Sequence, residues 1–123
     1  AYTFNDHATI SRINATEWFV APHGRPGGGN SLFRRTLRNV GGNPAIDPAG
    51  EEVAEGVNNM QVSFLLPGNA DFVTSAAVPN ARWDEVMAVR IAITFESADA
   101  IGTGGIRIQR PMIQTFNLRN RMP

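Results

Sequence analysis

In the stretch Met87-Ala88-Val89-Arg90-Ile91-Ala92-Ile93-Thr94-Phe95-Glu96, apolar side chains alternate with small or polar ones. An alternation with a period of two residues is typical of a β-strand that has one buried face. We therefore predict a central strand here, with Val89, Ile91, Ile93 and Phe95 in the core. A slip of one residue would turn this face outward, so an Ile91 side chain more than half exposed would show that the register is wrong.

Two further strands are predicted from the same kind of pattern. Apolar side chains at Met60, Val62, Phe64 and Leu66 alternate with Gln61, Ser63 and Leu65, and Pro67 and Gly68 end the run. Apolar side chains of Ile106–Leu118 also share one face, but Pro111 has no N–H to donate to a neighbouring strand. The C-terminal strand is therefore expected to lie at a sheet edge or to contain a bulge.

The remaining elements complete the prediction of the fold class. Strands at Arg12–Ala21 and Ser31–Arg38, joined by a glycine-rich loop, indicate a hairpin. Asp47 can cap a short helix that begins at Pro48 and ends at Gly56. We expect a single domain over residues 1–123, of the α+β class and mainly β, built on an antiparallel sheet.

The composition narrows the classes of function. Eleven basic and eleven acidic residues give a formal net charge of zero, and there is no cysteine. A neutral chain has no global attraction for nucleic acid or anionic lipid. The lack of cysteine excludes disulfides, thiolate metal sites and cysteine nucleophiles. The longest mainly apolar run, Met87–Phe95, is far shorter than the roughly 20 residues of a spanning helix.

No catalytic pattern stands out in the sequence. His7 and His23, the two histidines, lie in different segments without metal-ligand spacing. Gly27-Gly28-Gly29-Asn30 lacks the ending of a phosphate-binding loop and leads into a strand rather than a helix. We therefore expect no enzyme activity, no catalytic residue, no cofactor and no metal.

Charged clusters leave alternatives open. The acidic cluster suits either calcium or the positive end of the expected helix. It contains Asp47, Glu51, Glu52 and Glu55. The basic clusters suit either a phosphate backbone or solvated strand edges that resist aggregation. They contain Arg34, Arg35 and Arg38, and then Arg107, Arg110, Arg119 and Arg121.

Four segments, in their order along the chain, resemble the PilW-type minor pilins of type IV pili. The most specific reads Glu55-Gly56-Val57-Asn58-Asn59-Met60-Gln61-Val62 and is similar to an acid-Gly-Val-x-Asn-Met-Gln-Val motif of that family. The others are Arg12–Pro22 with the later Ser31–Arg35, then Trp83–Ile91, then Phe116–Arg121. The family is similar to the J-type pseudopilins of type II secretion.

The resemblance implies a pilin-like head that lacks the N-terminal pilin helix, and thus a periplasmic fragment of an anchored protein. It implies a structural subunit that takes part in pilus assembly or initiation at or near the fibre tip, supporting twitching motility, adhesion or DNA uptake. The alternatives are a J-like pseudopilin of type II secretion and an adhesin module that binds DNA or a surface. The expected location is the periplasm and inner membrane before assembly and the extracellular pilus afterwards.

The implied partners are other minor pilins, the major pilin and a pilus-tip adhesin, with DNA a further candidate and the membrane reached only through the absent helix. Consecutive large apolar residues on the first hairpin cannot all face one core, so we expect the partner surface there, with arginine at its rim. The alternative is a second layer of the domain itself that covers both faces of the hairpin. The residues expected to bind partners are Trp18, Phe19, Phe33, Arg34, Arg35 and Arg38.

Overall fold

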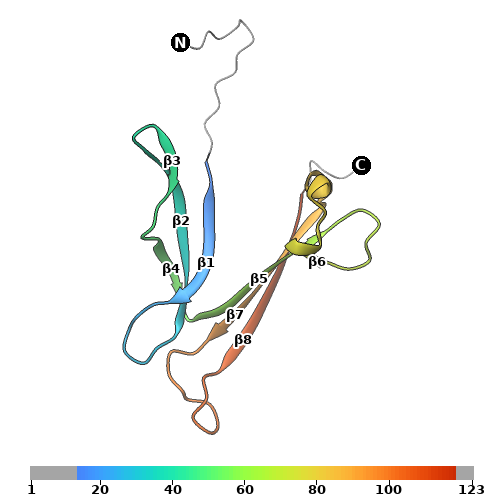
Figure 1. Ribbon diagram of the computed structural model, residues 1–123. Helices are drawn as coiled ribbons and strands as arrows, with labels where there is room; N and C mark the ends of the chain where they lie inside the picture. The colour runs from blue at the N-terminus through green and yellow to red at the C-terminus, as the bar shows by residue number, and fades with distance from the viewer. Residues whose placement is uncertain (1–13, 119–123) are drawn as a thin grey trace, which may run out of the picture.

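The computed structural model describes residues 14–118 and shows two four-stranded sheets that diverge from a shared corner (Figure 1). The first sheet contains β1 (Thr16–Pro22), β2 (Asn30–Val40), β3 (Asn43–Ile46) and β4 (Glu51–Glu55). The second contains β5 (Val57–Leu65), β6 (Val73–Thr74), β7 (Ala88–Glu96) and β8 (Gln109–Asn117). Every strand pairing is antiparallel, which confirms the prediction of a mainly β fold on antiparallel sheets.

The second sheet has the order β6-β5-β7-β8, and β7 is the central strand predicted from the alternating stretch. Ile91 of β7 lies opposite Val62 of β5 on one side and Gln114 of β8 on the other. Pro111 lies on β8, opposite Thr94. Because β8 is the last strand of the sheet, the prediction that proline marks an edge is confirmed.

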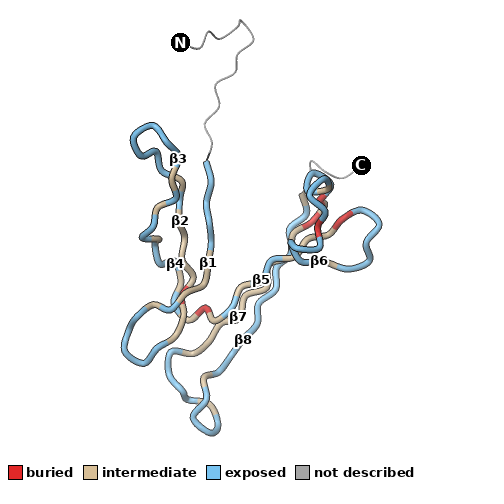
Figure 2. Tube along the Cα trace, in the orientation of Figure 1, coloured by how far each residue is buried: buried red, intermediate tan, exposed pale blue. Residues whose placement is uncertain are grey.

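The expectation that one face of β7 lies in the core is only partly right, because the side chains on that face are not fully buried. All four of its apolar side chains are half-buried, and the fully buried cluster is instead Leu66, Val78 and Val86 (Figure 2). This cluster forms because the segment after β5, with the 3₁₀ turns η1 (Ser75–Ala77) and η2 (Asn80–Glu85), folds back over one end of the sheet. Ile91 is not more than half exposed, so the predicted register stands.

The first sheet is organised by the long strand β2. It pairs with β1 along one side and with β3 and β4 along the other. The predicted hairpin of β1 and β2 is therefore confirmed from Thr16 onward, while its predicted start at Arg12 lies outside the described residues. The turn from β2 to β3 is Gly41-Gly42, with φ of 60° and 90°, and two positive φ values suit a two-residue hairpin turn.

The predicted short helix over residues 48–55 is wrong, because this segment contains β4, which pairs with β2. Asp47 does not cap a helix; its Oδ1 accepts the Ala49 N–H at 3.1 Å, which closes a turn of the chain. The register of β4 places Glu51 opposite Arg34, and the two side chains form an ion pair. Main-chain pairing and cross-strand charge thus override the helix-start signals that the local sequence carries.

The two sheets meet at Gly56, the residue between β4 and β5. Its N–H donates to the Asn30 carbonyl of the first sheet at 3.1 Å, and its carbonyl accepts the Glu96 N–H of the second sheet at 2.7 Å. The next residue, Val57, is 1% exposed. Within residues 14–118, no helix has the length and apolar character to span a bilayer. The single-domain organisation of residues 1–123 stays a prediction.

Candidate functional site

The six residues predicted to bind partners do not share one surface. In the β1–β2 register, Trp18 lies opposite Arg34 and Phe19 lies opposite Phe33. Because side chains alternate between the faces of a strand, these two pairs point to opposite faces of the first sheet. One face, called here the Trp18 face, carries Trp18, Arg34 and Arg38. The other, called the Phe19 face, carries Phe19, Phe33 and Arg35.

The Trp18 face presents a large, accessible aromatic ring. Trp18 is 44% exposed, and the Arg34 guanidinium lies 6.0 Å from the centre of its ring. Arg34 also binds Glu51, and Arg38 binds Asp47, each as an ion pair. The face therefore combines an exposed ring with arginines whose charge is already balanced.

The Phe19 face is a more ordered stack. The rings of Phe19 and Phe33 stack with centroids 5.5 Å apart, and the Arg35 guanidinium lies 4.3 Å from the centre of the Phe19 ring. Arg35 Nη2 also donates to Glu17 Oε1 at 3.0 Å. Gly50 passes close to this stack, since a Cβ there would lie 3.3 Å from Phe19 Cζ. The stack is partly covered by its own chain.

The acidic cluster noted in the sequence is distributed among arginines. Asp47 pairs with Arg38, Glu51 with Arg34, and both Glu52 and Glu55 with Arg25. No group of three or more potential metal ligands is found within residues 14–118. Each of these four carboxylates therefore has a basic partner in the described structure.

A network of polar groups, called here the junction, connects the loops of the two sheets. Glu52 accepts hydrogen bonds from Ser31 Oγ at 2.6 Å and from both terminal nitrogens of Arg25, at 2.9 and 2.6 Å to Oε1. Ser31 is completely buried. Arg107, from the loop between β7 and β8, donates to the carbonyls of Gly27 and Gly28 at 2.6 and 3.3 Å. None of these contacts is local in the sequence, so no sequence pattern indicates the network.

The environment of Glu52 lowers the pKa of its carboxyl. The largest cause is the Ser31 hydrogen bond, and the nearby Arg25 charge adds to it, while desolvation opposes both. Since the unfolded chain binds this proton more readily than the folded chain, the contribution of Glu52 to stability is present above the ordinary glutamate pKa. It is lost as the pH falls through the lower, folded-state value.

Replacing Ser31 by alanine is expected to raise the pKa of Glu52 towards its ordinary value. The variant should also lose less stability than the parent as the pH falls through that range, because the folded-state preference for the ionised carboxyl is smaller. The pKa is measured by NMR of the Glu52 carboxyl carbon, and the stability by denaturant unfolding at several pH values. Ser75→Ala, at an exposed position in η1, is the control and should leave the Glu52 titration unchanged.

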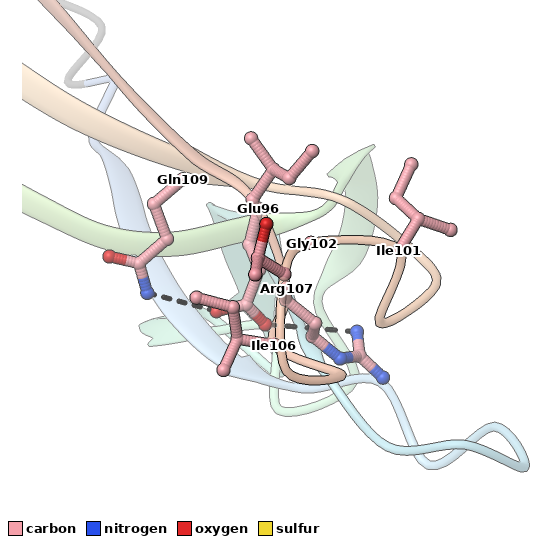
Figure 3. Close-up of a pocket in the computed structure, with 8 residues that line it drawn as sticks. Glu96, Ile101, Gly102, Ile106, Arg107 and Gln109 are labelled. Carbon is pink, nitrogen blue, oxygen red and sulfur yellow. Dashed lines mark hydrogen bonds and ion pairs between the residues drawn. The ribbon is translucent and has the colours of Figure 1, made fainter.

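An open hollow of about 950 Å³ lies against the loop between β7 and β8 (Figure 3). Figure 3 shows Glu96 between Gln109 and Arg107, with contacts of 3.1 and 3.7 Å. Ile101 and Ile106, two other lining residues, are 71% and 64% exposed. Glu96 is the one carboxylate that lines the hollow, and Gln109 and Arg107 already bind it. The hollow therefore offers a surface for contact rather than a set of catalytic groups.

A comparison with models of protein families identifies the family of this chain. The family model described as type IV pilus-assembly protein W matches residues 19–118, which is most of the chain. The chain belongs to the PilW family. A search of curated proteins and a search of solved structures each gave no match.

Membership of the PilW family confirms the resemblance found in the sequence motifs. It assigns the chain to type IV pilus assembly, an envelope process in which it interacts with other pilus components. The family is one of pilus-assembly proteins and is not a known class of enzyme. The match begins at Phe19, so Trp18 lies just outside it, whereas the Phe19 face, the junction and the whole second sheet lie within it.

Proposed function

We propose that this PilW-family chain is the head of a structural minor pilin, which helps to initiate the pilus and lies at or near the fibre tip. The observation that carries the proposal is an apolar face on the second sheet that is at most half-buried over its middle. Three strands contribute to it in register: Met60 and Val62 from β5, Ile91 and Ile93 from β7, and Met112 from β8.

Such a face suits a head that packs against another element. Val62 is 37% exposed and Met112 49% exposed, although apolar side chains lie beside both on the neighbouring strand β7. A contiguous exposed apolar patch marks an interaction site in a soluble domain. In a minor pilin, a pilin helix and the neighbouring heads in the fibre would cover this apolar face. The protein would lie at the inner membrane before assembly and in the extracellular pilus afterwards.

The arginine clusters give little support to the alternative of a DNA-binding module. Each arginine of the first cluster is paired with a carboxylate, Arg34 with Glu51, Arg35 with Glu17 and Arg38 with Asp47. Arg107 of the second cluster binds main-chain carbonyls, while Arg119 and Arg121 lie outside the described residues. Paired guanidinium groups release fewer counterions on binding a phosphate backbone, so they add less to affinity.

The function is tested in a piliated bacterium that encodes this chain in its full-length gene. Deletion of the gene should reduce surface pili and twitching, and the full-length protein should be present in sheared fibres. Met112→Asp should fail to restore piliation, whereas Ile113→Asp, which points to the opposite face of the same exposed strand, should restore it. Normal piliation without the gene, with loss of a type II secreted protein instead, would establish the pseudopilin alternative.

The Trp18 face is proposed as a second contact surface of the head. Trp18→Ala should weaken binding to soluble heads of the other minor pilins by about tenfold or more, because exposed tryptophans are frequent anchors of interfaces. Binding is measured by titration calorimetry, with circular dichroism to confirm that the sheet persists. Ile46→Ala, at an exposed apolar position on β3, is the matched control. Equal affinity of Trp18→Ala and the parent would move the contact surface elsewhere.

A further inference from the structure

The edge strand β8 exposes large apolar side chains on both of its faces. All nine of its residues are exposed, including Met112 at 49%, Ile113 at 63% and Phe116 at 49%. Met112 and Phe116 share the face that continues the apolar rows of β5 and β7, because they lie opposite Ile93 and Val89. One side of the strand is paired with β7, and its other side is the edge of the sheet, with no strand of residues 14–118 beside it.

The hydrogen bonds at the two ends of β8 identify which main-chain groups point to the free edge. Leu118 donates its N–H to the Met87 carbonyl at 2.7 Å, and Ile108 accepts the Ser97 N–H at 2.9 Å. The register between these points is continuous, so the even-numbered residues bond to β7. The odd-numbered residues Ile113, Thr115 and Asn117 therefore direct their N–H and C=O groups away from the sheet.

The two halves of this edge differ in how they resist pairing. Arg110 and Pro111 occupy the first half, and a charge together with a proline is how natural edge strands avoid new partners. Pro111 is odd-numbered, so the N–H that proline lacks would have pointed to the free edge. The ladder with β7 therefore loses no donor. The second half, residues 112–117, has no charge, no proline and no glycine. It is a sequence suited to strand pairing.

We propose that residues 112–116 of β8 pair antiparallel with the same residues of a second copy, about a two-fold axis at Gln114. In this register Ile113 bonds to Thr115 of the second copy, using the main-chain groups of both edges. Met112 lies opposite Phe116 of the second copy, and the two-fold axis repeats the pair. The apolar faces of the two second sheets then become one continuous surface.

The occupant is a second copy because the edge is complementary to itself in this register. On one face Met112 meets Phe116, on the other Ile113 meets Thr115, which is also β-branched, and the two glutamines at the axis meet as hydrogen-bonding amides. A pairing centred on Thr115 would instead set Gln114 against Phe116. The chain has a formal net charge of zero, so two copies do not repel each other over distance. This inference goes beyond the proposed function and does not depend on it.

The first test is sedimentation velocity of the purified 123-residue chain over a wide range of concentration. The parent should shift from the monomer to twice its mass as the concentration rises. Thr115→Pro should move this shift to a concentration at least about tenfold higher. The substitution removes the Thr115 N–H, which points to the edge, and leaves the hydrogen bonds between β8 and β7 in place. A parent that stays monomeric throughout, or a variant that associates like the parent, overturns the proposal.

The second test uses the absence of cysteine from the chain. Gln114→Cys should form a disulfide-linked dimer on mild oxidation, because Cα atoms of a directly opposed non-hydrogen-bonded pair are about 4.5 Å apart. Ile113→Cys is the control: its two copies lie diagonally, at roughly 7–8 Å, which is too far for an easy disulfide. Equal rates of cross-linking for the two variants contradict the register, whatever effect the proline variant has on folding.

Discussion

Leu66→Ala is expected to lower the free energy of unfolding by about 2–5 kcal/mol, because it removes a buried side chain and leaves a cavity. Leu66 is 2% exposed and forms the fully buried cluster with Val78 and Val86. Few other side chains within residues 14–118 are fully buried, so this cluster is a main apolar contact of the segment after β5, beside the β5–β6 pairing and the Phe64–Trp83 ring contact. The effect is measured by denaturant unfolding followed by circular dichroism.

Ile106→Ala is the matched control for this prediction. Ile106 loses a similar number of carbon atoms on truncation, but it is 64% exposed, and surface substitutions change stability by about 0.5 kcal/mol or less. A Leu66 variant as stable as the Ile106 variant would show that the cluster does not hold the 67–86 segment in place.

Gly56→Ala is expected to destabilise the chain by about 2–4 kcal/mol, for two separate reasons. Gly56 has a φ of +72°, a conformation that costs other residues about 1–3 kcal/mol. An added Cβ would also lie 2.7 Å from the Glu96 carbonyl oxygen, a main-chain atom that cannot move away alone. Unfolding in denaturant measures the total, and hydrogen exchange of the Glu96 amide reports whether its bond to Gly56 is lost.

Gly68→Ala separates the two causes. Gly68 has a similar φ of +81°, but an added Cβ there meets no atom within 4 Å. This variant should therefore show only the cost of the backbone conformation, and its Glu96 amide should exchange like that of the parent. If the two glycine variants lose equal stability, then the close approach of the sheets at Gly56 contributes nothing.

The strands of the second sheet could be predicted because their sequences carry the pattern themselves. The alternation in residues 87–96 establishes both that a strand forms and which side chains share a face. It does not say how deeply that face is buried, because burial depends on what packs over it. Ile91 is half-buried although its register is right, whereas Leu66 is fully buried because a distant segment, with Val78 and Val86, folds onto it.

The first sheet shows where local patterns fail. Asp47, Pro48 and three glutamates are good signals for the start of a helix, yet the segment is the strand β4. The glutamates bind arginines that are 17 to 30 residues away in the sequence, Arg34 and Arg25. Local propensity cannot foresee partners at that distance. The residues expected to bind partners lie on the β1–β2 hairpin, but without the register their division between two faces could not be foreseen.

The corner at Gly56 also determines how the head responds to load. Each sheet keeps its own ladder of strand pairs, whereas Gly56 and the Arg107 contacts hold the two sheets to each other through a few hydrogen bonds. A pulling force that spreads the two arms therefore acts on those bonds before it acts on the ladders. If this chain forms part of a filament under tension, we expect its two sheets to move relative to each other at this corner while each ladder of strands stays intact.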